Sequence, residues 1–124
     1  MEILCPVSLG EALDKISILR IKLARIQDAD KVTHIRHELE RLSAAVGNLD
    51  QYRASLDALQ DVNSAIWDIE DAIRRKEKSG QFDADFIALA RSVYVNNDKR
   101  FAIKNQINQQ FQSSIQEQKS YEKY

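Results

Sequence analysis

A chain of 124 residues is long enough for one domain with one hydrophobic core, so we expect residues 1–124 to form a single domain. Apolar residues make up 44% and charged residues 30%, which excludes a disordered chain, and three Gly and one Pro leave little room for a turn-rich β fold. The net charge of −1 argues against binding to nucleic acids or acidic membranes, because both need a basic surface.

The N-terminal residues 1–7 are predicted to be extended and to lie across the helices. Their apolar run is short and is interrupted by Glu2 and Pro6, so it indicates neither a signal peptide nor a membrane span. The one cysteine, Cys5, excludes an internal disulfide and suits a reducing compartment, which predicts a cytoplasmic protein. Because Cys5 lies in this apolar run, we expect a buried, unreactive thiol.

A first helix is predicted after Ser8, which can cap it, with Glu11 in the reciprocal capping-box position. Arg20 falls inside the apolar arc of this helix, whereas Ile18 and Ile21 fall outside it and predict a second contact surface. The seam itself repeats at spacings of three and four: Leu9, Ala12, Ile16, Leu19, Leu23 and Ile26.

A second helix is predicted after Asp28 or Asp30 and ends at Gly47. The two histidines of the chain lie opposite its apolar seam, so they are expected at the surface and no metal site is predicted. The seam residues again follow spacings of three and four: Val32, Ile35, Leu39, Leu42 and Val46.

A third helix is predicted from a cap at Asn48 to Gly80, and Asn63 and Glu70 fall on its apolar side. Because apolar residues surround Glu70 in the sequence, we expect its carboxylate to be buried and paired with Arg74, one turn further on. The apolar seam is long: Leu49, Tyr52, Leu56, Leu59, Val62, Ile66, Ile69 and Ile73.

A fourth helix is predicted from Asp83 to about Phe111, and its apolar face changes into a polar one beyond Tyr94. Four polar residues fall within an arc of roughly 80° on the side that should be apolar: Asn97, Arg100, Lys104 and Asn108. Buried charges are costly unless they are paired. This end of the helix is therefore expected either to protrude into water or to face a partner or ligand.

Short connections between the helices predict an all-α, antiparallel four-helix bundle with two long C-terminal helices and an extended N-terminal segment. Counting residues from the turns places Arg20 level with about residue 60, Arg100 level with residues 63–66, and Lys104 about one turn below. The polar residues on the apolar faces of three helices are thus expected to converge near the middle of the bundle.

The candidate site consists of the residues that this alignment brings together: Tyr94, Asn97, Arg100, Lys104 and Asn108 with Asn63, Glu70 and Arg20. Its cations outnumber the carboxylates expected nearby, which favours a small anion such as a phosphate, a carboxylate or a nucleotide sugar. The alternative is an internal pair of Arg20 and Glu70, with the cations of the fourth helix extending into solvent.

Catalytic motifs are missing from the sequence, which contains no nucleophile–base pair, Gly-rich phosphate loop, HExxH motif or cysteine pair. No cofactor is expected, and whether the protein is an enzyme stays open. Any chemistry would rest on electrostatic stabilisation by oriented cations.

Motifs spread over nearly the whole chain are shared with one family: residues 6–11 (PVSLGE), 14–16 (DKI), 21–22 (IK), 67–71 (WDIED), 89–94 (LARSVY), 97–100 (NDKR), 104, 107–108 (IN) and 119–121 (KSY). On these motifs the chain resembles a small uncharacterised family of bacterial and phage helical proteins, a domain of unknown function. The resemblance implies genes near those of glycosyltransferases and surface polysaccharides, and it implies no activity. Arg20 departs from the family, in which an acidic residue is more usual.

We therefore expect a non-enzymatic, self-associating interaction module, a homodimer with a further protein partner, working beside a larger enzyme system. Four apolar positions on outer helix faces predict the dimer surface: Ile18, Ile21, Val95 and Ile103. The alternative is a small-anion binding protein or enzyme that uses Arg100 and Lys104.

Overall fold

The computed structural model describes residues 1–124 and contains four α-helices, one 3-10 turn and no strand, which confirms the all-α prediction. The elements in chain order are α1 (Leu9–Arg25), α2 (Ala29–Val46), η1 (Leu49–Tyr52), α3 (Arg53–Lys78) and α4 (Ala84–Gln110). The last two helices have 26 and 27 residues. No helix combines the length and the apolar character needed to cross a membrane.

Local capping groups set the helix starts. Three predicted caps each accept a hydrogen bond of 3.0 Å from the backbone N–H three residues further on: Ser8, Asp28 and Asp83. Asn48 caps η1, which leads directly into α3. Gly47 and Gly80 follow α2 and α3 with φ of 92° and 67°, the left-handed region that glycine enters without steric cost.

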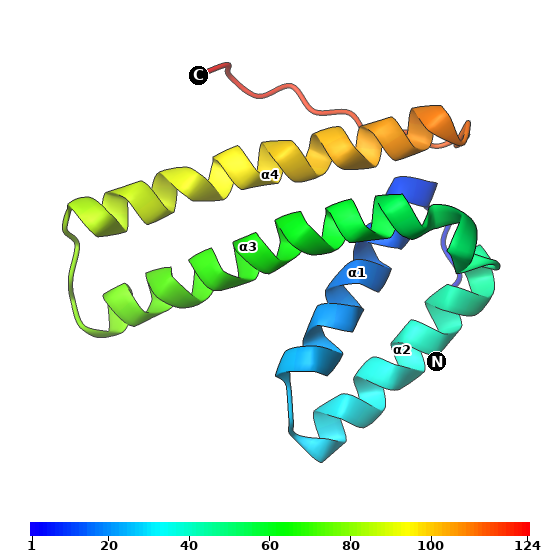
Figure 1. The fold of residues 1–124 in the computed structure, drawn as a ribbon, viewed down its shortest axis with the longest axis horizontal. Helices are drawn as coiled ribbons and strands as arrows, with labels where there is room; N and C mark the ends of the chain where they lie inside the picture. Colours follow the sequence, from blue (N-terminus) through cyan, green and yellow to red (C-terminus); the bar gives the residue numbers. More distant parts are fainter.

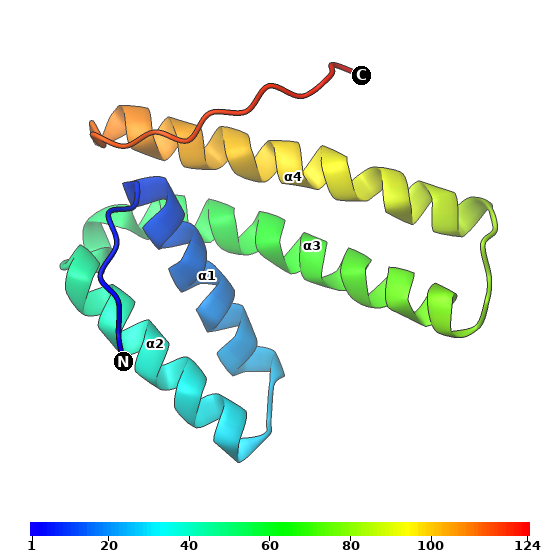
Figure 2. The same cartoon turned by 180° about the vertical axis from the view of Figure 1, so that it is seen from behind.

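Two helical hairpins make up the fold. Figure 1 shows α1 and α2 as one hairpin that is inclined to a second, longer hairpin of α3 and α4, and Figure 2 shows the same arrangement from behind. Helix α1 packs against each of the other three helices, whereas α2 packs mainly on α1. The distal halves of α3 and α4 extend beyond the core, and we call this part, residues 64–103, the projecting hairpin.

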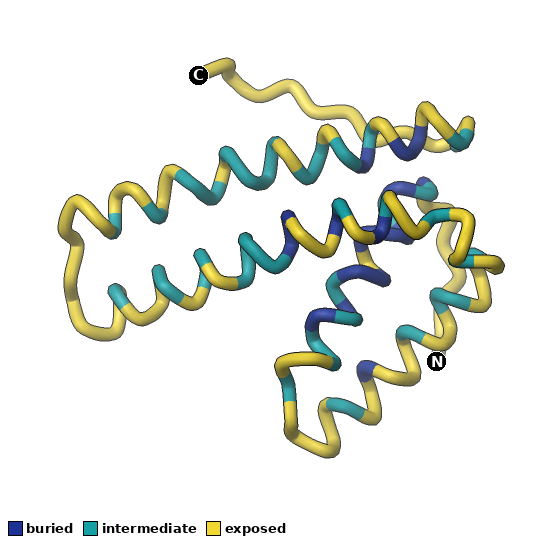
Figure 3. Tube along the Cα trace, viewed as in Figure 1, coloured by how far each residue is buried: buried dark blue, intermediate teal, exposed yellow.

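The core lies where α1 crosses α3 and α4. Five buried apolar side chains form it: Leu13, Ile16, Leu56, Leu59 and Ile107. Figure 3 shows that the buried positions gather at this crossing and are absent from the projecting hairpin. No residue from 64 to 103 is buried.

The four predicted outer apolar positions do not form one exposed surface, so the predicted dimer surface is wrong. Ile21 is only 3% exposed, and Ile103 packs against the core cluster. Ile18 and Val95 are partly buried. The reason lies in the position of α1, which is covered by α2 on one side and by the α3–α4 hairpin on another, so that it buries a wider arc than its seam predicts.

The N-terminal segment runs across the α1–α2 hairpin without regular structure, as expected (Figure 2). The carboxylate of Glu2 accepts two hydrogen bonds of 2.8 Å from the guanidinium of Arg41 on α2. These bonds attach the start of the N-terminal segment to α2. Cys5 is exposed, so its predicted burial is wrong. The apolar run lies on the helix surface instead of entering the core.

The C-terminal tail, residues 113–124, lies along α4 in both views (Figures 1 and 2). Gln112 has φ of 55°, which turns the chain back at the end of the helix. The Oγ atom of Ser113 accepts a 3.3 Å hydrogen bond from the backbone N–H of Leu9, so the turn is attached to the start of α1.

Candidate functional site

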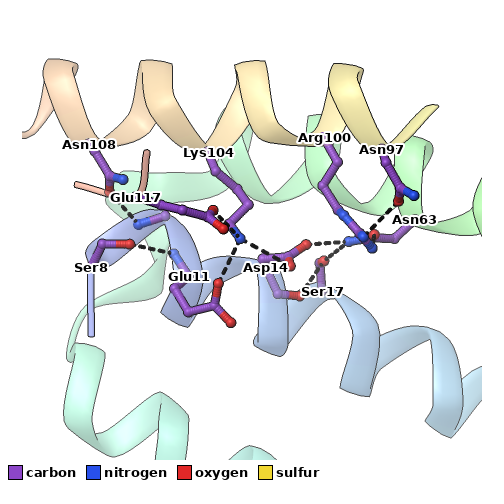
Figure 4. Close-up of polar contacts among 11 residues, drawn as sticks. Ser8, Glu11, Asp14, Ser17, Asn63, Asn97, Arg100, Lys104, Asn108 and Glu117 are labelled. Carbon is purple, nitrogen blue, oxygen red and sulfur yellow. Dashed lines mark hydrogen bonds and ion pairs between the residues drawn. The ribbon is translucent and has the colours of Figure 1, made fainter. Parts of the chain in front are cut away.

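The polar stripe of α4 faces the interior of the protein (Figure 4). Lys104 and Asn108 are buried, and Asn97 and Arg100 are partly buried. Of the two outcomes predicted for this stretch, protrusion into water is therefore wrong. The groups that it faces belong to α1, α3 and the tail of the same chain.

At one end of the stripe, Asn108 meets Gly10 of α1. The backbone N–H of Gly10 donates a 2.7 Å hydrogen bond to Oδ1 of Asn108. A Cβ atom at Gly10 would lie 2.6 Å from the carbonyl oxygen of Lys104, closer than atoms can approach. The two helices thus touch backbone to backbone, and this crossing requires glycine.

One turn along the stripe, Lys104 meets three carboxylates. Its Nζ atom lies 2.6 Å from Oε2 of Glu11, 3.0 Å from Oε1 of Glu117 and 4.0 Å from Oδ2 of Asp14. The hydrogen bond from Lys104 holds the pKa of Glu11 below its usual value. Burial lowers the pKa of Lys104, but the bonds to Glu11 and Glu117 outweigh it, and the net shift is upward.

This arrangement overturns the predicted excess of cations around Lys104. In the predicted capping box, the carboxylate of Glu11 bonds to the backbone N–H of Ser8 at the start of the same helix. The backbone N–H of Glu11 does bond to Ser8, but its carboxylate turns towards Lys104 (Figure 4). Lys104 is therefore fully neutralised by its own chain, and no anion is needed there.

Asn63 of α3 links three helices. Its amide nitrogen donates to Oδ1 of Asp14 at 2.7 Å and to Oγ of Ser17 at 2.8 Å. Its amide oxygen accepts a 3.1 Å hydrogen bond from Nη1 of Arg100. Arg100 was predicted to lie level with Asn63, and the two side chains are in direct contact. No buried polar side-chain atom of the protein lacks a hydrogen-bond partner.

Arg100 differs from Lys104 in having no carboxylate partner. Its guanidinium bonds to the neutral amide oxygens of Asn63 and Asn97, at 3.1 and 2.8 Å. No carboxylate oxygen lies within 4.0 Å of it. Arg100 is thus the one cation of the stripe whose charge is not paired within the protein.

Two cavities flank Arg100. One, of about 280 Å³, lies between α1 and α3 and is lined by Asn63, Glu70 and Trp67. The other, of about 560 Å³, lies between α4 and the tail and is lined by Tyr94 and Asn97. The predicted site is therefore divided into a closed network around Lys104 and two open cavities that share Arg100.

Two predicted residues lie outside the network. Glu70 forms the expected pair with Arg74, at 3.4 Å, but its side chain is 41% exposed, so its predicted burial is wrong. The reason is that Glu70 lines the open cavity between α1 and α3 instead of packing against α1. Arg20 makes no ion pair with Glu70 or with any other carboxylate, so the alternative of an internal Arg20–Glu70 pair is also wrong.

Sequence reasoning missed the residues that surround Lys104 and Asn63. Gly10, Asp14 and Ser17 follow one another at helical spacings of four and three, so they form a stripe of small and polar residues beside the apolar seam of α1. That stripe is the signal for a polar interface. Glu117 carries no such signal, because it lies in a segment without periodicity.

The fold and the network define an all-helical protein in which α1, α3 and α4 are joined by a closed set of internal polar contacts. The chain belongs to the family DUF6165, a family of unknown function, and the match covers residues 3–124. This confirms the resemblance to a family of unknown function over nearly the whole chain. No curated protein and no solved structure matches the chain.

Proposed function

We propose that the protein is a homodimeric, non-enzymatic interaction module in which a second copy packs along the projecting halves of α3 and α4. The observation that carries this proposal is the complete lack of buried residues from 64 to 103. Apart from the contact of Arg25 with Asp68 and Trp67, α1 leaves this part of the hairpin uncovered. Two helices that pack mainly on each other cannot enclose a core, because each leaves part of its apolar face in water.

The projecting hairpin has apolar side chains to bury. Partly buried residues on its two helices share this property: Ile66, Trp67, Ile69 and Ile73 on α3, and Phe86, Leu89 and Val93 on α4. Near the turn, Phe82 and Ile87 are 59% and 56% exposed. Full burial of an exposed side chain of this size gains roughly 1.5–3 kcal/mol, so a few such contacts favour association.

The accessible area supports a second copy. The chain exposes 8717 Å², whereas a compact monomer of 14.3 kDa exposes about 6,800 Å². The extended termini account for part of this difference. A standard interface buries about 800 Å² on each partner, which the projecting hairpin can supply.

The charges on α3 favour a copy of the same chain, related by a two-fold axis. Residues 57–71 contain only acidic charges: Asp57, Asp61, Asp68, Glu70 and Asp71. Residues 74–78 are mainly basic, with Arg74, Arg75, Lys76 and Lys78 against Glu77. Two antiparallel copies place the basic end of each α3 against the acidic stretch of the other, and thus complete an antiparallel four-helix bundle.

Such a dimer suits a supporting role. The resemblance implies genes near those of glycosyltransferases and surface polysaccharides, so we propose that the dimer works beside such enzymes in the cytoplasm as a protein partner. The closed network around Lys104, which contains no nucleophile–base pair, supports a non-enzymatic role.

The test is the mass of the protein in solution, measured by multi-angle light scattering at high micromolar concentration. We expect twice 14.3 kDa for the unmodified chain and a monomer for Ile87→Glu. The matched control is Leu4→Glu, an even more exposed apolar position (84%) outside the projecting hairpin, and this variant should stay dimeric. Circular dichroism checks that both variants are folded, and a monomeric unmodified chain contradicts the proposal.

A further inference from the structure

The larger cavity beside Arg100 has the size of a small-molecule site. Its volume of about 560 Å³ lies within the range of about 300–1,000 Å³ that such sites occupy. One wall is α4, with Tyr94, Asn97 and Arg100, and the other wall is the tail, with Lys119 and Tyr121. This cavity is separate from the network around Lys104, and its argument does not depend on the dimer.

Two cations line this cavity without ion-pair partners. The guanidinium of Arg100 bonds only to amide oxygens. The Nζ atom of Lys119 lies over the rings of Phe101 and Tyr121, 5.2 and 5.6 Å from their centroids. No carboxylate oxygen lies within 4.0 Å of either cation.

Two carboxylates also line the cavity, but neither forms an ion pair with these cations. One of them, Asp98, lies beside the phenol of Tyr124 and raises the pKa of that phenol. Glu122 is the other acidic residue of the lining. Neither carboxylate comes within 4.0 Å of Arg100 or Lys119, so both cations keep N–H donors for an anionic ligand.

Aromatic side chains supply the remaining surface. Tyr94 of α4 and Tyr124 of the tail meet edge to face, with ring centroids 5.0 Å apart. Tyr121 adds a third phenol ring, which is 74% exposed. Exposed rings at this density offer stacking surfaces for a flat ligand, and Asn97 adds an amide that can orient it.

We propose that this cavity binds a small ligand that combines an anionic group, phosphate or carboxylate, with a flat ring. Arg100 and Lys119 bind the anionic group from the two walls, the guanidinium as a planar fork and the ammonium as a point charge. The tyrosines stack against the ring. Because Lys119, Tyr121 and Tyr124 belong to the tail and Arg100 and Tyr94 to α4, the ligand also holds the tail against α4.

The experiment is a titration followed by amide resonances in two-dimensional NMR, with phenyl phosphate, benzoate, inorganic phosphate and phenol as probes. Phenyl phosphate or benzoate should shift the resonances of residues 94–101 and 119–124 in a saturable manner, and the tighter of the two identifies the anionic group. Inorganic phosphate should bind about fivefold more weakly, since it lacks the ring that stacks on tyrosine.

Variants of the tail keep the test independent of folding, because the tail lies outside the core. Lys119→Ala should weaken binding of the aryl anion about tenfold, as the loss of one charge-assisted contact implies. Lys123→Ala is the matched control, a tail lysine that does not line the cavity, and it should bind normally. No saturable shift with either aryl anion at 10 mM, equal binding of phenol, or equal weakening by both variants overturns the proposal.

Discussion

The backbone N–H of Gly10 and the side-chain oxygen of Asn108 are joined by a 2.7 Å hydrogen bond, although they lie 98 residues apart in the chain. The bond forms because the backbones of α1 and α4 meet at Gly10, where a Cβ atom would stand 2.6 Å from the carbonyl oxygen of Lys104. This contact sets the angle at which α1 crosses the longer hairpin.

Gly10→Ala tests the close approach through the sign of its effect. In an unhindered helix, replacing glycine by alanine stabilises by about 0.5–1 kcal/mol. At Gly10 we expect a loss of about 1–3 kcal/mol, because the added methyl group must push the helices apart. Urea unfolding at one fixed protein concentration measures the difference, and a gain in stability contradicts the structure.

Asn63→Asp tests the link between α1 and α3. The substitution replaces a donor amide that lies 2.7 Å from the Asp14 carboxylate by a second carboxylate. We expect a loss of about 1–3 kcal/mol, since a buried hydrogen bond is lost and like charges meet. The control is Asn105→Asp, which makes the same chemical change on α4 outside the network and should alter stability by less than about 0.5 kcal/mol.

The Glu11–Lys104 pair predicts how stability depends on pH. The pKa of Glu11 is lowered from 4.5, because Lys104 bonds to its carboxylate. Its stabilising contribution is therefore complete above pH 4.5 and is lost as the pH falls through the lowered pKa. Burial lowers the pKa of Lys104, but its bonds to Glu11 and Glu117 raise it on balance above 10.5. Its contribution is complete below pH 10.5 and is lost as the pH rises through the raised pKa.

Lys104→Met separates this pair from the other titrating groups. At pH 7 we expect a loss of about 2 kcal/mol, less than the ~3–5 kcal/mol of a fully buried pair, because Glu11 and Glu117 are near enough to solvent to be rehydrated. The difference from the unmodified protein should shrink below pH 4.5. Arg74→Met, at the exposed pair with Glu70, should cost at most about 1 kcal/mol. Similar losses from both variants at pH 7 contradict the buried network.

Two variants with reversed charges on α3 test the proposed two-fold pairing of this helix. An acidic variant reverses the basic end with R74E, R75E and K78E. A basic variant reverses the acidic stretch with D57K, D61K and D71K. Each should be monomeric alone, because like charges then face each other, whereas their mixture should form a heterodimer with both contacts restored. Native mass spectrometry of the mixture measures this, and a mixture of monomers refutes the pairing.

The helix starts were predictable from the sequence because their causes are local. Ser8 and Asp83 each cap a helix through a bond that spans three residues, and no tertiary contact is needed. The contact of Arg100 with Asn63 was also predictable, since helix lengths and short turns fix which levels of neighbouring helices meet.

The burial of Ile21 and the partners of Lys104 were not predictable in the same way. Periodicity shows which face of a helix is buried but not the angle at which two helices cross. That angle depends on Gly10, which acts through the absence of a side chain. The stripe of small and polar residues to which Gly10 belongs indicates a polar interface but not a crossing angle. Once α1 is inclined, it turns Ile21 inward and brings Glu11 and Asp14 beneath Lys104.

The contacts that hold α1 also constrain the order of folding during synthesis. The partners of Gly10 and Glu11 are Asn108 and Lys104, so neither contact can form until nearly all of α4 has left the ribosome. Until then the polar stripe of α1 stays hydrated, while α1 and α2 can pair as a local hairpin. Contacts between residues so distant in the chain slow folding, and the first helix therefore reaches its final position among the last.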